Sequence, residues 1–296
     1  MSDWIIETVG LRRNFGSQVA VDRLDLEVSR GSIFGFLGRN GAGKTTTIRL
    51  LLGFLKSGGG EVRVFNETVT GPEGNAGLRR RIGYVSESKY LYPYMTVQQI
   101  IRFTRPFFPG WRGDLERRYL EMFNLPPDRK ISALSKGMRT SLMLLLAMSH
   151  GAELLILDEP IEGLDPAVIE TLLKELVALP ATEGTTVFFS SHQLAEVEQI
   201  ADHIAIIDRG RKVVGGSLDD LKVQYQRLRV VFQREPSPIA WPPGADHVRQ
   251  EGRTVSILAS SNVEAIVEQA RSFPGTSVER FPVSLKEIFL EHVRSN

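Results

Sequence analysis

An α/β fold built on a mostly parallel central sheet is the architecture that the sequence predicts. Apolar segments followed by glycine-rich or helical sequence recur along the chain, as buried parallel strands do. They occupy residues 32–38, 81–87, 154–160, 186–192 and 203–210. Helical periodicity separates them, for example in AVIETLLKELVAL (167–179), and this alternation is typical of a parallel sheet covered by helices. The 296 residues, of which 42% are apolar, suffice for one large domain and a smaller one.

Three regions depart from this alternation. Residues 1–31 and 61–70 have the pattern of short antiparallel strands and predict an N-terminal antiparallel β-subdomain. Residues from about 88 to 150 are mostly helical in pattern and predict a helical insertion between two core strands. A proline-rich segment precedes a mixed strand and helix pattern near the C-terminus, which predicts a small α+β appendage. We therefore expect two domains, 1–222 and 223–296.

Composition excludes several classes of protein. The net charge is +1, from 36 basic and 35 acidic side chains, so no overall field favours nucleic acid or an anionic membrane. The chain has no cysteine, which excludes disulfides, thiolate metal sites and a cysteine nucleophile. The N-terminus lacks the pattern of a secretory signal. The densest apolar segments, 141–148 and 153–160, are far shorter than the roughly 18–20 residues of a membrane helix, so we expect a protein that works at a membrane, if at all, from outside the bilayer; a cytoplasmic location fits the absence of cysteine.

A phosphate-binding loop is the strongest motif in the sequence. GRNGAGKTT (38–46) follows the strand-like SIFGFL and opens a helical segment, which is the context that gives G-x-x-x-x-G-K-[ST] its meaning. Its glycines let backbone N–H groups turn toward an anion at a helix N-terminus. We expect Lys44 to reach the β and γ phosphates and Thr45 to bind Mg²⁺. The predicted nucleotide contacts are Gly38, Arg39, Asn40, Gly41, Ala42, Gly43, Lys44, Thr45 and Thr46.

Two acids at the end of an apolar strand complete this prediction. LLILDEP (154–160) places Asp158 where the metal shell of a phosphate-loop protein needs a carboxylate. Glu159 lies one residue further and is the candidate general base that deprotonates the attacking water. Alone, this segment would equally fit a strand with a polar end.

The motifs together resemble those of the ATP-binding cassette (ABC) ATPases, the motor subunits of ABC transporters, which have the P-loop NTPase fold. The resemblance covers roughly residues 3–220. LSKGM (134–138) resembles the family signature LSGGQ, which contacts the γ phosphate of an ATP bound to the opposite subunit. The resemblance implies nucleotide contacts from Ser135, Lys136, Gly137 and Met138. Taken alone, the segment favours a plain helix N-cap at Ser135.

Three further residues match positions of that family. GLDP (163–166) resembles the loop in which Asp165 helps to join two subunits across ATP, and an N-cap role for Asp165 is compatible with this. His192, after the strand TVFFSS, resembles the histidine that contacts the γ phosphate. Phe15 resembles the aromatic residue that stacks on adenine.

The sequence also departs from the family pattern. Glu87 stands where glutamine is common, and because a carboxylate also binds magnesium we include it among the metal ligands. Lys136 replaces a glycine of the signature, and Met138 replaces its glutamine. Lys136 either adds positive charge near the γ phosphate or is solvated, and the weakness of exposed charges favours the second. Glu162 is an extra acid near the expected dimer seam, for which the sequence offers no physical account.

The resemblance implies partners and cofactors. We expect an ATPase that uses ATP and Mg²⁺ and pairs head to tail with a second copy of itself or a homologous ATPase. It would drive an integral membrane permease from the inner face of the cell membrane. LSKGM, Glu87 and the final SLKEIFLEHV look most like ATPases of bacterial ABC-2 type exporters, so export is the preferred direction.

A soluble ABC protein that acts on ribosomes or DNA is the alternative. Such proteins have two cassettes in one chain or a long coiled coil, and this sequence has one cassette and no heptad repeat. The basic segments 78–81 and 227–234 are short, so we interpret them as solvated faces and expect no nucleic acid partner. A nucleotide kinase or GTPase would leave LSKGM and GLDP unexplained.

Overall fold

The chain divides into two units. The computed structural model describes residues 3–88 and 90–293, and the contacts within it separate Met1–Gly215 from Gly216–Asn296. This division precedes the expected boundary after residue 222 because helix α8 (Leu218–Gln224) groups with the second unit. Each unit has its own sheets and is described by itself.

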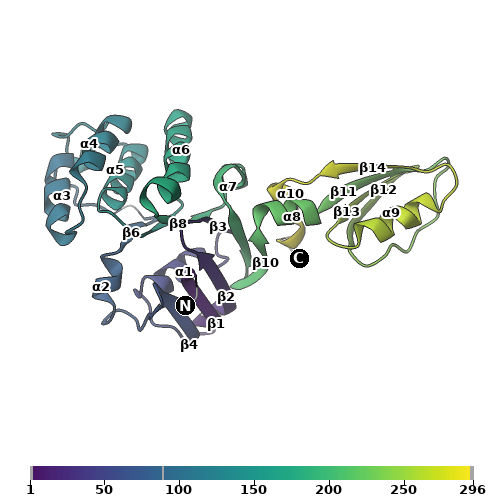
Figure 1. Cartoon of the computed structure of the whole chain (residues 1–296), viewed down its shortest axis with the longest axis horizontal. Coiled ribbons are helices and arrows are strands. Elements are labelled where there is room, and N and C mark those ends of the chain that lie inside the picture. Colours follow the sequence, from purple (N-terminus) through teal and green to yellow (C-terminus); the bar gives the residue numbers. More distant parts are fainter. Residues whose placement is uncertain (1–2, 89, 294–296) are drawn as a thin grey trace. The chain divides into compact units, whose positions relative to one another are not determined.

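The first unit is organised around the predicted parallel sheet. Its strand order is β10-β9-β3-β8-β7-β6, and the pairs from β9 to β6 are all parallel (Figure 1). The strands are β3 (Ile33–Gly38), β6 (Ile82–Val85), β7 (Leu154–Asp158), β8 (Thr186–Ser191), β9 (His203–Asp208) and β10 (Arg211–Ser217). The predicted α/β fold is confirmed. Because β3, β7 and β8 are adjacent and parallel, residues that follow their carboxyl ends are brought to one edge of the sheet.

A second, antiparallel sheet forms the predicted N-terminal β-subdomain. Its order is β2-β1-β4-β5, with β1 (Trp4–Phe15), β2 (Gln18–Ser29), β4 (Gly59–Val64) and β5 (Glu67–Thr68). Strand β1 pairs antiparallel with both β2 and β4. The long hairpin of β1 and β2 places Phe15 at its tip, next to the turn.

Helices cover both faces of the parallel sheet. Helix α1 lies on the face shared with the antiparallel sheet, and α6 and α7 lie on the other (Figure 1). The helical insertion contributes α3, α4 and α5. The helices of this unit are α1 (Lys44–Leu51), α2 (Ala76–Arg79), α3 (Val97–Thr104), α4 (Gly113–Met122), α5 (Lys136–Met148), α6 (Pro166–Glu183) and α7 (Leu194–Ile200), with short 3-10 turns at Arg105–Phe107 and Ile131–Ala133.

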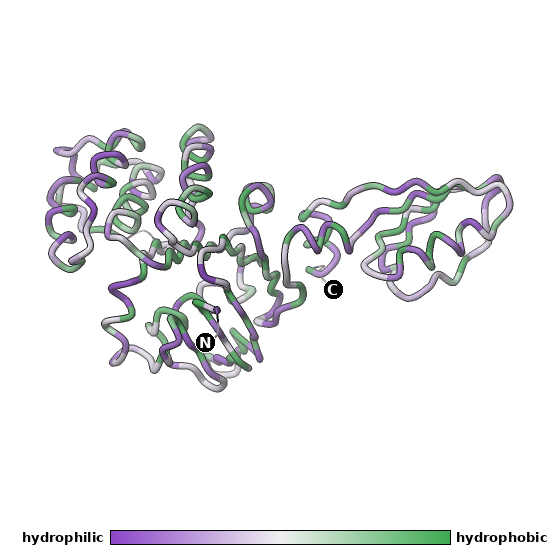
Figure 2. The backbone as a smooth tube through the Cα atoms, viewed as in Figure 1, coloured by the Kyte–Doolittle hydropathy of each residue, from purple (hydrophilic) through white to green (hydrophobic). Residues whose placement is uncertain are grey.

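Burial on both faces explains why the central strands are continuously apolar. Side chains alternate between faces along a strand, so Phe34, Phe36 and Phe188 point to the same side. The rings of Phe34 and Phe188 stack with centroids 5.6 Å apart, and Phe36 lies 5.2 Å from Phe188. On the opposite face Gly35 lies against the side chain of Val197 in α7. Figure 2 shows the tube through these strands largely in the colour of hydrophobic residues.

The helices of the insertion begin at capping residues that the sequence encodes. Thr96 and Gln99 form a reciprocal capping box at the start of α3. Ser135 caps α5 by accepting a hydrogen bond from the backbone N–H of Met138. Across residues 3–88 and 90–293, none of the helices is both long enough and apolar enough to pass through a bilayer.

The second unit is the predicted small α+β appendage. Its antiparallel sheet has the order β12-β13-β11-β14, and the apolar side of α9 joins Leu228, Val230 and Ile257 in a separate core. Its elements are α8, β11 (Gln226–Val231), β12 (Ala245–Glu251), β13 (Thr254–Ala259), α9 (Val263–Arg271), β14 (Ser277–Pro282) and α10 (Leu285–His292). The basic segment 227–234 is mostly strand β11, with Arg227 and Arg229 exposed and the intervening residues buried.

Candidate functional site

A polar hollow of about 250 Å³ lies at the carboxyl ends of the central strands. Most residues of the predicted phosphate loop line it, together with Phe15 from the β1–β2 hairpin and two acids that follow the ends of β6 and β7. The lining residues are Phe15, Gln18, Ala20, Arg39, Asn40, Gly41, Gly43, Lys44, Thr45, Thr46, Glu87 and Glu159. The two sheets of the first unit together therefore bring residues that are up to 144 positions apart (Phe15 to Glu159) to one hollow.

The phosphate loop has a backbone that only glycine suits at its last turn. Gly43 has φ +109°, and a side chain there would run into the backbone carbonyl of Ala20. Helix α1 begins at the next residue, Lys44, and none of the described side chains caps its first turn. The free N–H groups of that turn and the positive end of the helix dipole make this place favourable for an anion.

Lys44 is buried within the loop. Its Nζ donates a hydrogen bond to the carbonyl oxygen of Gly38 at 2.7 Å and lies 3.3 Å from Glu159 Oε1. Both side chains are only 7% exposed, so this attraction is weakly screened by solvent. The ammonium group is thus held beside the phosphate-binding backbone, where it can exchange the carboxylate for another anion.

Glu159 is held in an unusual backbone conformation. Its φ of 50° lies in the left-handed region, which is uncommon for a non-glycine residue. Its N–H donates to the carbonyl oxygen of Ser190 at 3.2 Å. Its Oε2 lies 2.8 Å from His192 Nδ1. The predicted base and the predicted histidine therefore contact each other, on the same side of the loop as Lys44.

A candidate cation site lies next to the phosphate loop, at Thr45, Glu87 and Asp158. Asp158 is fully buried; Ser190 Oγ donates to its Oδ1 at 2.6 Å, and its Oδ2 has no partner among the described residues. Burial raises the pKa of Asp158, opposed by the hydrogen bond from Ser190. Thr45 Oγ1 in turn donates to Glu87 Oε2 at 3.3 Å. The candidate cation site therefore offers two carboxylates and one hydroxyl group. One carboxylate oxygen, Asp158 Oδ2, has no hydrogen-bond partner among the described residues.

This donor set fits magnesium. No group of three or more histidine, cysteine or acidic side chains that could hold a metal occurs in the part of the chain that the structure describes. Mg²⁺ bound with a nucleotide needs only one or two carboxylates, because water and phosphate oxygens complete its octahedron. A bound cation would also supply the missing partner for Asp158 Oδ2 and offset the cost of burying its charge.

Phe15 lies at the rim of the hollow. Its side chain is 46% exposed, and the guanidinium of Arg13 lies 4.9 Å from its ring centroid. An aromatic ring half open to solvent beside a phosphate site can stack on a planar base. Gln18 and Ala20 line the same rim and were not predicted.

The signature residues lie outside this hollow and form a second cluster. Ser135 caps α5, whose first residue is Lys136. A Cβ on Gly137 would lie 2.5 Å from the carbonyl oxygen of Gly163, so the start of α5 packs closely on the GLDP segment. Asp165 Oδ1 accepts from the N–H of Ala167 at 3.0 Å and caps α6, as its N-cap interpretation requires.

Lys136 and Glu162 form an ion pair in this second cluster. Lys136 Nζ lies 2.6 Å from Glu162 Oε1, and the two side chains are 60% and 38% exposed. Lys136 was expected to be solvated or near a phosphate; it is solvent-accessible but also paired. The extra acid that the sequence left unexplained is its partner.

Ser190 is the functional residue that sequence reasoning missed. Its side chain contacts Asp158, and its carbonyl oxygen accepts from Glu159, so it holds both acids. The available signal was a serine directly after the apolar residues VFF of the predicted strand and two residues before His192; in the structure Ser190 is fully buried. A buried hydroxyl needs a hydrogen-bond partner, and the adjacent strand β7 ends in a carboxylate.

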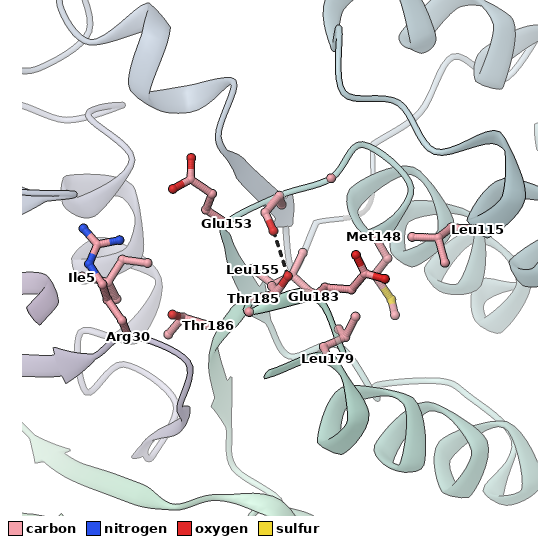
Figure 3. A pocket seen from close by; sticks show the side chains of 13 residues that line it. Ile5, Arg30, Leu115, Met148, Glu153, Leu155, Leu179, Glu183, Thr185 and Thr186 are labelled. Atoms are coloured by element: carbon pink, nitrogen blue, oxygen red, sulfur yellow. Dashed lines mark hydrogen bonds between the residues drawn. The ribbon is translucent and has the colours of Figure 1, made fainter. Parts of the chain in front are cut away.

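A second cavity of about 160 Å³ lies at the opposite edge of the sheet, where β7 and β8 begin. Glu153, Thr185 and Thr186 line it together with apolar side chains, and Thr185 Oγ1 donates to the carbonyl of Ala152 at 2.9 Å (Figure 3). It has neither a glycine-rich loop nor any of the predicted site residues within the described chain. The first hollow is therefore the candidate nucleotide site.

Comparison with known proteins identifies relatives along most of the chain. A family model described as "ABC transporter" matches residues 21–162. The bacitracin transport ATP-binding protein BcrA of Bacillus licheniformis is 38% identical over 225 residues, covering 75% of this chain and 73% of that protein. The Nod factor export ATP-binding protein I of Ralstonia nicotianae is 32% identical over 301 residues, covering 97% and 92%.

Two solved structures share the fold of about three quarters of this chain. An ATP binding subunit of an ABC transporter aligns with a TM-score of 0.68 and 29% identity, covering 74% of this chain and 92% of that chain. The dimeric structure of MJ0796, a bacterial ABC transporter cassette, aligns with a TM-score of 0.65 and 20% identity, covering 72% and 98%.

Proposed function

The chain belongs to the ABC transporter family and is an ATPase of it, and on this premise we propose that it is the motor subunit of an exporter whose membrane channel is a separate polypeptide. The observation that carries the proposal is the set of contacts that joins Lys44, Glu159 and His192 beside the phosphate loop. It combines a phosphate-binding cation, a candidate base and a third polar group in one site.

ATP binding and release of the base are linked in this proposal. The γ phosphate takes the place of Glu159 beside Lys44, because a phosphate at a helix N-terminus competes well for the buried ammonium. The freed carboxylate accepts a proton from water as the water oxygen attacks the γ phosphorus and the bond to the β-phosphate oxygen breaks. The products are ADP and inorganic phosphate. Lys44 and His192 stabilise the charge on the transferred group.

Thr45, Asp158 and Glu87 would hold Mg²⁺, with Ser190 orienting Asp158. When bound, the cation supplies charge neutralisation to the phosphate oxygens. Phe15 stacks on the adenine ring in this proposal, since it is the exposed aromatic residue that lines the hollow.

Two copies, or one copy and a homologous ATPase, would complete each site. Ser135, Gly137 and Met138 lie outside the hollow of their own chain, at the start of α5. A head-to-tail pair would place this start of α5 against the ATP held by the partner's phosphate loop. Asp165 would lie at the seam. MJ0796, which shares this fold, is known as a dimer.

An exposed aromatic patch supports a membrane-protein partner. It comprises Tyr90, Tyr92, Tyr94, Phe103 and Phe107. Four of these rings form a chain of contacts, in which Tyr92 touches Tyr94 and Phe103, with centroids 5.8 Å apart in each pair, and Phe103 lies 5.6 Å from Phe107. Clustered exposed aromatic side chains are typical of protein interfaces. The patch begins close after Glu87 in the chain, so a partner bound there lies a short segment away from the nucleotide.

Export is the direction that the relatives favour. One of them is named for bacitracin transport and another for Nod factor export. The protein would act at the inner face of the cell membrane, attached through its membrane subunit.

Replacing the base tests the catalytic assignment. We expect Glu159→Gln to reduce ATP hydrolysis by about a hundredfold or more, because the amide cannot accept the proton from water. ATP should still bind and should trap a dimer. Hydrolysis is measured as phosphate release, and the dimer by size-exclusion chromatography with ATP. Glu170→Gln, on the exposed face of α6, is the matched control and should keep full activity.

Full hydrolysis by Glu159→Gln would overturn the role of Glu159. The rival function is tested by purification from membranes in mild detergent. Recovery with a membrane protein supports transport, whereas recovery with ribosomes or DNA alone would favour the soluble alternative.

A further inference from the structure

The ion pair of Lys136 and Glu162 joins two segments that the proposed mechanism assigns to different nucleotides. Lys136 belongs to the signature residues 135–138, which face an ATP held by the partner. Glu162 lies three residues after the base Glu159, which acts on the ATP of its own chain. The pair is 26 positions apart in sequence, and Nζ lies 2.6 Å from Oε1. Both residues depart from the family pattern at these positions.

Further contacts join the same two segments. Thr140 Oγ1, one turn into α5, donates to the carbonyl oxygen of Lys136 at 3.1 Å and lies 3.4 Å from the carbonyl oxygen of Glu162, so it is placed between the two segments. The carbonyl of Gly163 lies so close to Gly137 that no side chain fits between them. The aliphatic part of Lys136 lies over Gly163, since a Cβ built there would be 3.1 Å from the Lys136 Cδ atom. A displacement of the first turn of α5 must therefore move residues 162–163 as well.

A short turn carries this connection to the base. The N–H of Glu162 donates to the carbonyl oxygen of Glu159 at 3.4 Å. Glu159 itself is held at φ 50°, so its side-chain direction depends on the backbone that follows it. The turn from 159 to 162 is thus the shortest covalent route from the pair to the catalytic carboxylate.

Electrostatics explains why Lys136 keeps an acidic partner. A cation at the first residue of a helix lies at the positive end of the helix dipole, where it is unfavourable. The carboxylate of Glu162 compensates for this charge. A solvent-accessible pair of this kind contributes little to folding, so removing it should alter coupling without unfolding the protein.

We propose that Lys136 and Glu162 are positioning residues whose ion pair couples closure of the signature segment on the partner's ATP to the alignment of Glu159 in the chain's own site. The inference rests on the proposed function. When the start of α5 closes on the partner's nucleotide, the pair carries residues 162–163 with it and the turn sets the direction of Glu159. Neither residue contacts the reacting atoms of its own site.

A double-mutant cycle on the full-length protein tests the coupling. We expect Lys136→Ala and Glu162→Ala each to lower kcat for ATP hydrolysis by about tenfold, and the double variant to lower it no further, because the two act as one unit. KM for ATP should change less than kcat. The melting temperature should stay close to that of the parent. Lys136→Arg, which keeps the ion pair, should retain kcat within about threefold.

Glu170→Ala provides the matched control, because it removes an exposed ion pair, to Lys174 at 2.7 Å, that lies away from both clusters. It should leave kcat unchanged. The coupling would be overturned if the two single losses of kcat multiplied in the double variant. It would also be overturned if kcat fell only as the melting temperature fell. Either result would leave the ATPase function intact. Equal hydrolysis by the parent and Glu159→Gln would instead overturn the catalytic assignment, and the coupling with it.

Discussion

At the scale of single residues, Ser190 decides how the two acids of the site are held. It is fully buried at the end of β8, and its hydroxyl is committed to Asp158 at 2.6 Å. Its carbonyl holds the N–H of Glu159 at 3.2 Å, in the left-handed backbone conformation described above. The candidate metal ligand and the candidate base thus depend on one small residue of the neighbouring strand.

Ser190→Ala should reduce magnesium-dependent ATP hydrolysis by about ten- to a hundredfold, the range usual for residues that orient a metal ligand. The loss arises because Asp158 would keep its buried charge with one hydrogen bond fewer. Hydrolysis is measured across a magnesium titration, which should show a higher magnesium requirement. Ser191→Ala is the matched control, since that hydroxyl contacts Gln193 rather than Asp158. An unchanged magnesium requirement in Ser190→Ala would contradict this role.

At the scale of elements, the end of the helical insertion contains a buried histidine. His150 lies between α5 and β7, is 5% exposed, and stacks on Phe108 with ring centroids 4.1 Å apart. Burial lowers the pKa of His150 from 6.5 to about 4, opposed by backbone hydrogen bonds. The insertion therefore joins the core strand β7 through a neutral imidazole.

This burial predicts a pH dependence of stability. The unfolded chain takes up a proton at His150 near pH 6.5 and the folded chain only near pH 4. Stability from this group is therefore complete above pH 6.5 and is lost as the pH falls toward 4. At pH 5 the loss is about 2 kcal/mol, and His150→Phe should remove it. Unfolding in urea at pH 7 and pH 5 measures the difference.

Phe108→Leu is the control for this prediction. It disturbs the same contact without removing a titrating group, so its free energy of unfolding should fall at both pH values by a similar amount. The interpretation fails if His150→Phe keeps the full pH dependence of the parent.

At the scale of the whole molecule, the chain has two units with separate cores. The core of the first unit joins both of its sheets with α1, and that of the second joins β11, β13 and α9. The candidate nucleotide site lies wholly in the first unit. A ligand that binds only one unit stabilises that unit by mass action.

Calorimetry should therefore resolve two unfolding transitions, of which ATP shifts one. In Glu159→Gln, ATP and Mg²⁺ at about a hundredfold excess over Kd should raise the melting temperature of the first unit by about 5–10 °C. Leu228→Ala, in the core of the second unit, should destabilise only the other transition, by about 2–5 kcal/mol. Leu24→Ala is the counterpart in the first unit. A single transition that responds to both changes would contradict this picture.

The sequence by itself determined the local chemistry of this protein. The phosphate loop, its glycines and the start of α1 are encoded within nine consecutive residues, 38–46, because strand, turn and helix signals act over a few residues. The acids 158 and 159 were equally predictable, since they end an apolar strand. The N-cap of α5 by Ser135 followed from the residue types alone.

Only the tertiary structure decided which distant side chains meet. Glu159 and His192 are 33 positions apart, and Lys136 and Glu162 are 26 apart. Their contacts depend on the order of strands in the sheet and on the packing of α5 against the GLDP segment, which hydrophobic periodicity does not specify. For the same reason the sequence did not predict the role of Ser190. Its hydroxyl group contacts Asp158 only because β8 lies next to β7 and parallel to it.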